Sequence, residues 1–278
     1  MANGLLRRLG GWIAHYLNGE VSGYRPTAMD DVETLRDILQ PGDILLVEGN
    51  RRISTAIKYL TQSTWSHAAL YIGPGVVSGA ADDPPVLIEA DTEHGVIASP
   101  LSKFNGLHTR ICRAVGLSLE DRQAVVDFAA ARIGLQYDLK NIIDLARYLL
   151  PTPPVPTRFR RRLLSLGSGE PTRAICSTLI AQAFQEVGYP VLPAVTRRPT
   201  LPGEPEYCET CVVEVYHARH HSLFTPRDFD LSPYFAVVKP TIATGFDYRQ
   251  LEWGPPCVAD ETAQANPACE VAPSAPPA

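Results

Sequence analysis

The stretch that decides the fold is Ser-His-Ala-Ala-Leu-Tyr-Ile-Gly, at residues 66–73. Its apolar and aromatic content, followed by the turn residues Gly-Pro-Gly at 73–75, predicts a strand over residues 67–72. Because side chains alternate between the two faces of a strand, we expect His67, Ala69 and Tyr71 on one face and the intervening side chains on the other. The pattern therefore places a histidine at the start of a strand.

The segments on either side of this strand continue a β pattern and then change to a helical period. In the first half, short apolar runs between turn residues predict strands over 43–47, 86–90, 95–98 and 109–114, with helices over 30–39 and 53–61. In the second half, the pattern predicts helices over 118–133, 139–150 and 176–187 and strands over 211–216 and 234–238. These elements predict an α+β fold with a small antiparallel sheet packed on helices.

Three regions differ in composition. We expect an N-terminal helical segment at 1–40, one domain at 41–240, and a Pro/Ala-rich tail at 241–278 whose end is disordered. Within the first region, residues 5–17 have the apolar stripe of an amphipathic helix. Such a helix usually packs on its own domain, and the alternative is a peripheral contact with a membrane surface.

Composition narrows the classes of partner and compartment. The chain has 278 residues with 25 basic and 30 acidic side chains, and a net charge of -5 without a basic patch predicts no nucleic-acid partner. The sequence has no apolar run of the roughly 18 to 20 residues that a membrane-spanning helix needs, and its first residues do not form a secretory signal. We therefore expect a cytoplasmic protein, peripheral at the membrane at most. Six cysteines are too few for a disulfide framework in a chain of this length, and we expect them reduced.

Cys176 stands where a loop enters the helix predicted over 176–187. Unpaired backbone amides at a helix N-terminus lower the pKa of a thiol, as a nearby imidazolium does. The same amides can bind the oxyanion of an acyl-transfer reaction. Cys176 is therefore the candidate nucleophile, whereas Cys112, inside a predicted strand, is interpreted as a core residue.

Glu89 lies within the strand predicted over 86–90, where an ionised carboxylate needs a partner. If this strand pairs with the strand that begins at His67, the carboxylate can accept a hydrogen bond from one imidazole nitrogen and leave the other for a nucleophile. Asp91, Glu93 and His94 follow closely, and the orienting role can also fall on one of them.

A second cysteine pattern, Cys-Glu-Thr-Cys at 208–211, has the two-residue spacing of a zinc site, and His217, His220 and His221 follow it. A four-ligand site would need two of these histidines to converge. A structural metal at this place is one alternative.

Four segments, in this order, resemble the permuted papain-like amidases, the YiiX- and YaeF-like branch of the NlpC superfamily of cysteine hydrolases. They are Pro-Gly-Asp-Ile-Leu-Leu at 41–46, Ser-His-Ala-Ala-Leu-Tyr-Ile-Gly at 66–73, Gly-Leu-Gln-Tyr-Asp at 134–138 and Cys-Ser-Thr-Leu-Ile at 176–180. The order is the specific signal, because ordinary papain-like enzymes place the cysteine before the histidine.

The resemblance implies a circularly permuted papain-like fold and a role for each of four residues. Cys176 would be the nucleophile, His67 the general base, Glu89 the orienting residue, and Tyr137 a hydroxyl donor to the developing oxyanion. The chain departs from the family pattern at Thr178, where an acidic residue is common.

We therefore expect a cysteine amidase or peptidase that uses no cofactor and no metal at its catalytic site, acting on amide bonds in peptides or in lipid-modified molecules. One alternative is a lipid-handling acyltransferase with the same thiol and histidine. Another is a non-catalytic binding module stabilised by a metal. The oligomeric state does not follow from the sequence.

Overall fold

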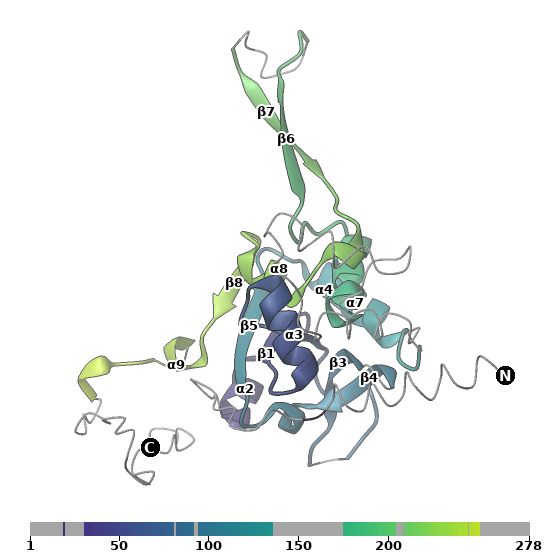
Figure 1. The fold of residues 1–278 in the computed structure, drawn as a ribbon, viewed down its shortest axis with the longest axis vertical. Helices are drawn as coiled ribbons and strands as arrows, with labels where there is room; N and C mark the ends of the chain where they lie inside the picture. Colours follow the sequence, from purple (N-terminus) through teal and green to yellow (C-terminus); the bar gives the residue numbers. More distant parts are fainter. Residues whose placement is uncertain are drawn as a thin grey trace, which may run out of the picture.

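The computed structural model describes residue 19 and residues 31–80, 82–91, 94–135, 175–203, 208, 210–243 and 245–250. Its sheet strands are β1 (Ile44–Glu48), β2 (His67–Tyr71), β3 (Pro85–Asp91), β4 (Gly95–Pro100), β5 (His108–Ala114) and β8 (Phe235–Val238), and β6 (Ala194–Pro199) and β7 (Val212–His217) form a separate pair. The helices are α2 (Val32–Ile38), α3 (Arg52–Thr61), η1 (Leu101–Phe104), α4 (Leu119–Ala130), α7 (Ile175–Glu186), η2 (His221–Leu223), α8 (Pro226–Leu231), α9 (Pro240–Ala243) and η3 (Tyr248–Gln250) (Figure 1).

The main sheet has the strand order β4-β3-β2-β1-β5-β8, and all its neighbouring strands are antiparallel. β1 lies between β2 and β5, and its residues 44–47 are at most 1% exposed. A strand covered on both faces and paired on both edges requires such a continuous apolar run. The predicted α+β fold with an antiparallel sheet is confirmed.

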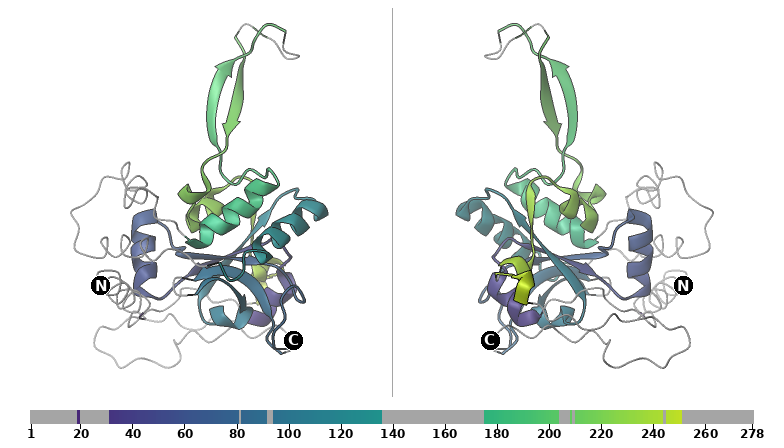
Figure 2. Two further views of the ribbon diagram at one scale, coloured as in Figure 1. Left: turned by 90° about the vertical axis from the view of Figure 1, so that its right-hand side faces the viewer. Right: turned by 90° about the vertical axis from the view of Figure 1, so that its left-hand side faces the viewer.

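Helices cover the two faces of this sheet unequally (Figure 2). On one face, Ala68 and Leu70 of β2 pack in the larger core with side chains of α4, α7 and α8. On the other face, Ala69 and Tyr71 pack in a smaller core with Leu35 of α2 and with side chains of η1. The alternation predicted for this strand is confirmed.

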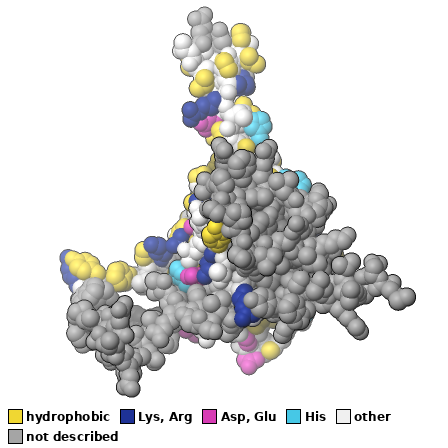
Figure 3. Space-filling view, in the orientation of Figure 1, with side chains coloured by type: hydrophobic (Ala, Val, Ile, Leu, Met, Phe, Trp, Pro, Cys, Tyr) yellow, Lys and Arg dark blue, Asp and Glu magenta, His cyan; other side chains and the backbone are white. Residues whose placement is uncertain are grey.

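β6 and β7 form an arm that projects away from the sheet and helices (Figures 1 and 2). β7 was predicted over 211–216, but β6 was not predicted. The β6 sequence Ala-Val-Thr-Arg-Arg-Pro has no apolar alternation because neither face of the arm is covered by a core, and five of its six residues are exposed. In the space-filling view the arm carries hydrophobic, basic, acidic and histidine side chains at its surface (Figure 3).

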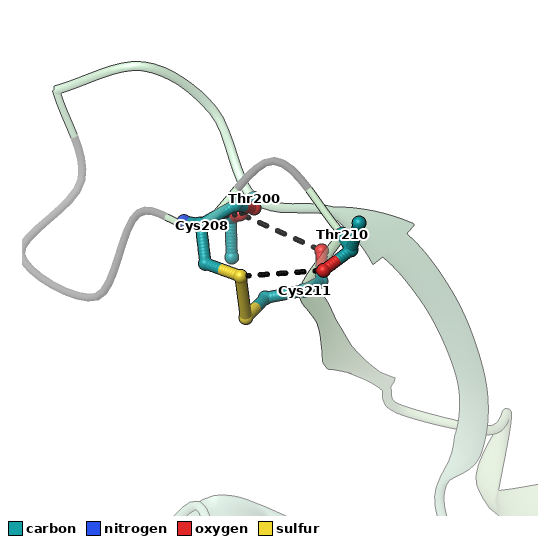
Figure 4. The surroundings of a disulfide bond; sticks show 4 residues. All are labelled: Thr200, Cys208, Thr210 and Cys211. Carbon is teal, nitrogen blue, oxygen red and sulfur yellow. Dashed lines mark hydrogen bonds between the residues drawn. A yellow bond between two sulfur atoms is a disulfide. The ribbon is translucent and has the colours of Figure 1, made fainter.

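A disulfide joins Cys208 and Cys211 at the tip of the arm, in the segment between β6 and β7 (Figure 4). The expectation of reduced cysteines is wrong for this pair. Their Cα atoms lie 5.0 Å apart, a separation that a disulfide bridges readily. Thr200 brings them together, because its hydroxyl donates to the Cys208 carbonyl at 2.6 Å and its amide donates to the Cys211 carbonyl at 3.0 Å.

The disulfide also removes both thiols from the metal site considered above. His217 lies 2.7 Å from the Thr196 hydroxyl and His220 lies 2.7 Å from the Ser222 hydroxyl. Within the described ranges, no group of three or more His, Cys, Asp or Glu side chains is arranged to hold a metal ion. The two cysteines close a loop.

Reduction of the Cys208–Cys211 disulfide is expected to loosen the arm without unfolding the sheet. A two-stranded hairpin without a core is marginally stable in water, and closing so short a loop contributes on the order of 1–2 kcal/mol. Trypsin cleavage after Arg197 should accelerate about tenfold with dithiothreitol, with an unchanged melting temperature. A Cys208→Ser, Cys211→Ser double variant should be cleaved rapidly with or without reductant. A melting temperature that falls on reduction would instead make the arm part of the cooperative core.

Several sequence predictions lie outside the described residues. They are the helix over 5–17, the helix over 139–150, Tyr137 and the tail from 251. The division into 1–40, 41–240 and 241–278 stays a prediction. In the part of the chain that the structure describes, we find no helix with both the length and the apolarity to cross a membrane.

Candidate active site

The candidate site lies where β2 and β3 separate. Their register covers only two pairs, Leu70 with Ile88 and Tyr71 with Leu87, so the strands are unpaired toward the start of β2. His67 is the first residue of β2, and Cys176 is the second residue of α7, which packs against both strands. The gap between the strands therefore admits a side chain from the helix.

His67 and Glu89 are joined directly. The Nε2 atom of His67 lies 2.7 Å from Oε2 of Glu89, across the gap between the strands. His67 also shares a hydrogen bond with the Cys176 side chain. Because Nε2 is engaged by the carboxylate, Nδ1 is the nitrogen that faces the sulfur. The structure thus brings three of the four predicted site residues together in the order carboxylate, imidazole, thiol.

The thiol of Cys176 has three further neighbours. The backbone N–H of Ala68 donates to its sulfur, and the Ser177 hydroxyl lies 3.9 Å away. Its buried side chain packs against Ala90 of β3. The Ala68 amide is available because β2 does not pair with β3 at this residue. A thiolate at the start of a 12-residue helix also lies at the positive end of the helix dipole.

The charges of the three groups shift their pKa values together. Burial alone would raise the pKa of Cys176, but the imidazolium of His67 and the hydrogen bonds to the sulfur lower it below its usual value. Burial likewise opposes a charged His67, yet the Cys176 thiolate and the Glu89 carboxylate raise its pKa to about 10. Both shifts favour the thiolate–imidazolium form of the pair.

Glu89 stays ionised although its side chain is only 2% exposed. Burial would raise its pKa, but the hydrogen bond and charge of His67, together with Lys103, lower the pKa to about 2. The Asp91 carboxylate lies 3.0 Å from Nδ1 of His94. The carboxylate beside His67 is that of Glu89. Glu93 lies outside the described residues.

Lys103 is a site residue that the sequence did not reveal. Its Nζ lies 2.6 Å from Oε1 of Glu89. Lys103 belongs to η1, which follows β4 and turns back toward Glu89. From the β3–β4 register alone Lys103 would be expected far from Glu89, because Pro100, at the end of β4, lies opposite Pro85 at the other end of β3. No local pattern marks such a contact.

Cys112 and Thr178 do not take part in the chain of Glu89, His67 and Cys176. Cys112 is fully buried in the core, and burial raises its pKa to about 12, so its interpretation as a core residue is confirmed. Thr178 is buried in α7.

Comparison with known proteins gives a family for part of the chain. Residues 38–148 match the model of the Peptidase_C92 family, described as "Permuted papain-like amidase enzyme, YaeF/YiiX, C92 family". This segment belongs to the permuted papain-like amidases. The match includes His67, Glu89 and Lys103 and ends before Cys176. The family assignment therefore agrees with the resemblance seen in the sequence, and the thiol is placed beside the family segment by the fold.

A solved structure is also similar to the chain. It is titled "Crystal structure of metalloprotein yiiX from Escherichia coli O157:H7, DUF1105", and the match has 18% sequence identity and a TM-score of 0.41. It covers 72% of this chain and 96% of that one.

Proposed function

We propose that the protein is a cysteine hydrolase that cleaves an amide or ester bond, with Cys176 as nucleophile, His67 as general acid–base and Glu89 as orienting residue. The observation that carries this proposal is the hydrogen-bonded chain from Glu89 through His67 to Cys176, assembled from β3, β2 and α7. The amidase family of residues 38–148 supports it.

In the first half of the proposed reaction, the Cys176 thiolate attacks the substrate carbonyl carbon and the electron pair of the carbonyl moves to its oxygen. As the tetrahedral intermediate collapses, the bond to the leaving amine or alcohol breaks and Nδ1–H of the His67 imidazolium protonates that group. The product is a thioester on Cys176. The Ala68 N–H supports the thiolate before attack, and Tyr137 stays the predicted donor to the oxyanion.

In the second half, water attacks the thioester. The neutral Nδ1 of His67 takes a proton from this water, and the thiolate leaves as the carboxylic acid forms. Throughout, Glu89 accepts the hydrogen bond from Nε2–H and keeps the imidazole in the tautomer with a free Nδ1. Every proton is returned, and no cofactor enters this scheme.

p-Nitrophenyl acetate tests the nucleophile without knowledge of the natural substrate. Peptide mass spectrometry after a brief incubation should find the acetyl group on Cys176, while the buried Cys112 of the same molecule stays unmodified. A Cys176→Ser variant should lose both the adduct and the release of p-nitrophenol. Acetylation elsewhere, with Cys176 unmodified in folded protein, would contradict the proposal. An added primary amine then separates the two chemistries, since a hydrolase passes the acetyl group to water and an acyltransferase passes it to the amine.

A further inference from the structure

The Glu89 carboxylate carries a cation on each of its oxygens. His67 binds Oε2 at 2.7 Å and Lys103 binds Oε1 at 2.6 Å. The side chain of Glu89 is 2% exposed, whereas that of Lys103 is 30% exposed. Lys103 thus reaches from the surface to a buried carboxylate that already belongs to the proposed catalytic chain. An ion pair with a buried partner differs from an exposed pair, which contributes little.

The elements packed around Glu89 place few other charged groups near its carboxylate. β4, the strand neighbour of β3 on its outer edge, consists of Gly-Val-Ile-Ala-Ser-Pro and has no ionisable side chain. β2 contributes His67, and α7 contributes Cys176, which acts on His67. Asp91, the next ionisable residue of β3, lies beside His94. The charge of the Glu89 carboxylate is therefore set mainly by His67 and Lys103.

We propose that Lys103 is a positioning residue of the site. It keeps Glu89 ionised and turned toward His67 while His67 loses and regains its Nδ1 proton. The inference rests on the proposed function, because it assigns Lys103 to the same reaction. When His67 has given its proton to the leaving group, Glu89 loses one of its two cations. A buried carboxylate with only a neutral imidazole beside it would favour the protonated form. Lys103 prevents this, and Nε2–H stays on His67.

The charge of Lys103 also acts on the thiol through this chain. A positive charge near the site stabilises the thiolate, so its removal should raise the pH at which Cys176 ionises. Rates of iodoacetamide labelling at Cys176 between about pH 5 and 9 report that pH directly and need no substrate. Lys103→Met should raise the midpoint by about 0.5 to 1 pH unit, and Lys103→Arg should restore it.

Lys239 provides a matched control, since it follows β8 at the opposite edge of the sheet. Lys239→Met should leave the midpoint at the wild-type value, and a single cooperative melting transition in each would show that all three variants fold. If the midpoint of Lys103→Met equals that of the wild type, the assignment of Lys103 is overturned while the proposed function stays in place. If instead Cys176 of the wild-type protein has the midpoint of a free thiol, and His67→Ala does not change it, the proposed function is overturned and the assignment of Lys103 with it.

Discussion

Hydrolysis of p-nitrophenyl acetate is expected to fall by about 10² to 10⁴-fold when His67 is replaced by alanine. Two contributions are lost together. Without the imidazolium, burial is left to raise the pKa of the Cys176 thiol, so the thiolate is scarce at neutral pH. Without Nδ1, nothing in the proposed scheme protonates the leaving group or activates water.

The pH dependence distinguishes these losses from a damaged fold. In the wild type, turnover should rise with pH as Cys176 ionises below the usual thiol range and fall as His67 deprotonates through about pH 10. In His67→Ala, iodoacetamide labelling of Cys176 should instead increase about tenfold per pH unit up to a thiol pKa above the usual value. His94→Ala is the control, because His94 is an exposed histidine that pairs with Asp91. A His67→Ala enzyme with wild-type turnover would remove the proposed general base.

The free energy of unfolding is expected to fall by about 3 kcal/mol at neutral pH when Glu89 is replaced by glutamine. The carboxylate has a pKa of about 2 in the folded protein, below the value of 4.5 for an unperturbed glutamate. Its folded-state pKa is lowered, so it stabilises the fold fully above about pH 4.5, and this stabilisation is lost as the pH falls toward 2. Glutamine cannot provide a negative charge for both His67 and Lys103.

Urea unfolding of wild type and Glu89→Gln between about pH 2 and 7 measures this difference. The two curves should converge on acidification, because protonated Glu89 resembles glutamine. Glu33→Gln makes the same change in an exposed ion pair with Arg36 and should alter stability by less than about 1 kcal/mol. A difference between wild type and Glu89→Gln that does not depend on pH would show that packing, and not the charge of Glu89, is responsible.

The local elements were predictable because their signals are local. The buried run at residues 44–47, the alternation along β2 and the helical period of α7 each follow from neighbouring side chains that must lie on one face. The placement of Glu89 beside His67 was predictable on one condition, that two strands adjacent in the chain pair, and antiparallel neighbours usually do.

By itself the sequence determined the α+β class and the histidine-before-cysteine order. Through the family resemblance it also indicated the nucleophile, base and orienting residue now proposed. Only the tertiary structure decided where β2 and β3 separate, and hence that the Ala68 amide faces the Cys176 sulfur. It also decided that Lys103 reaches Glu89 and that Cys208 bonds to Cys211 and not to a metal. Periodicity records which face of an element is buried, whereas these contacts depend on how turns and loops bring separate segments together, and no local pattern encodes that distance.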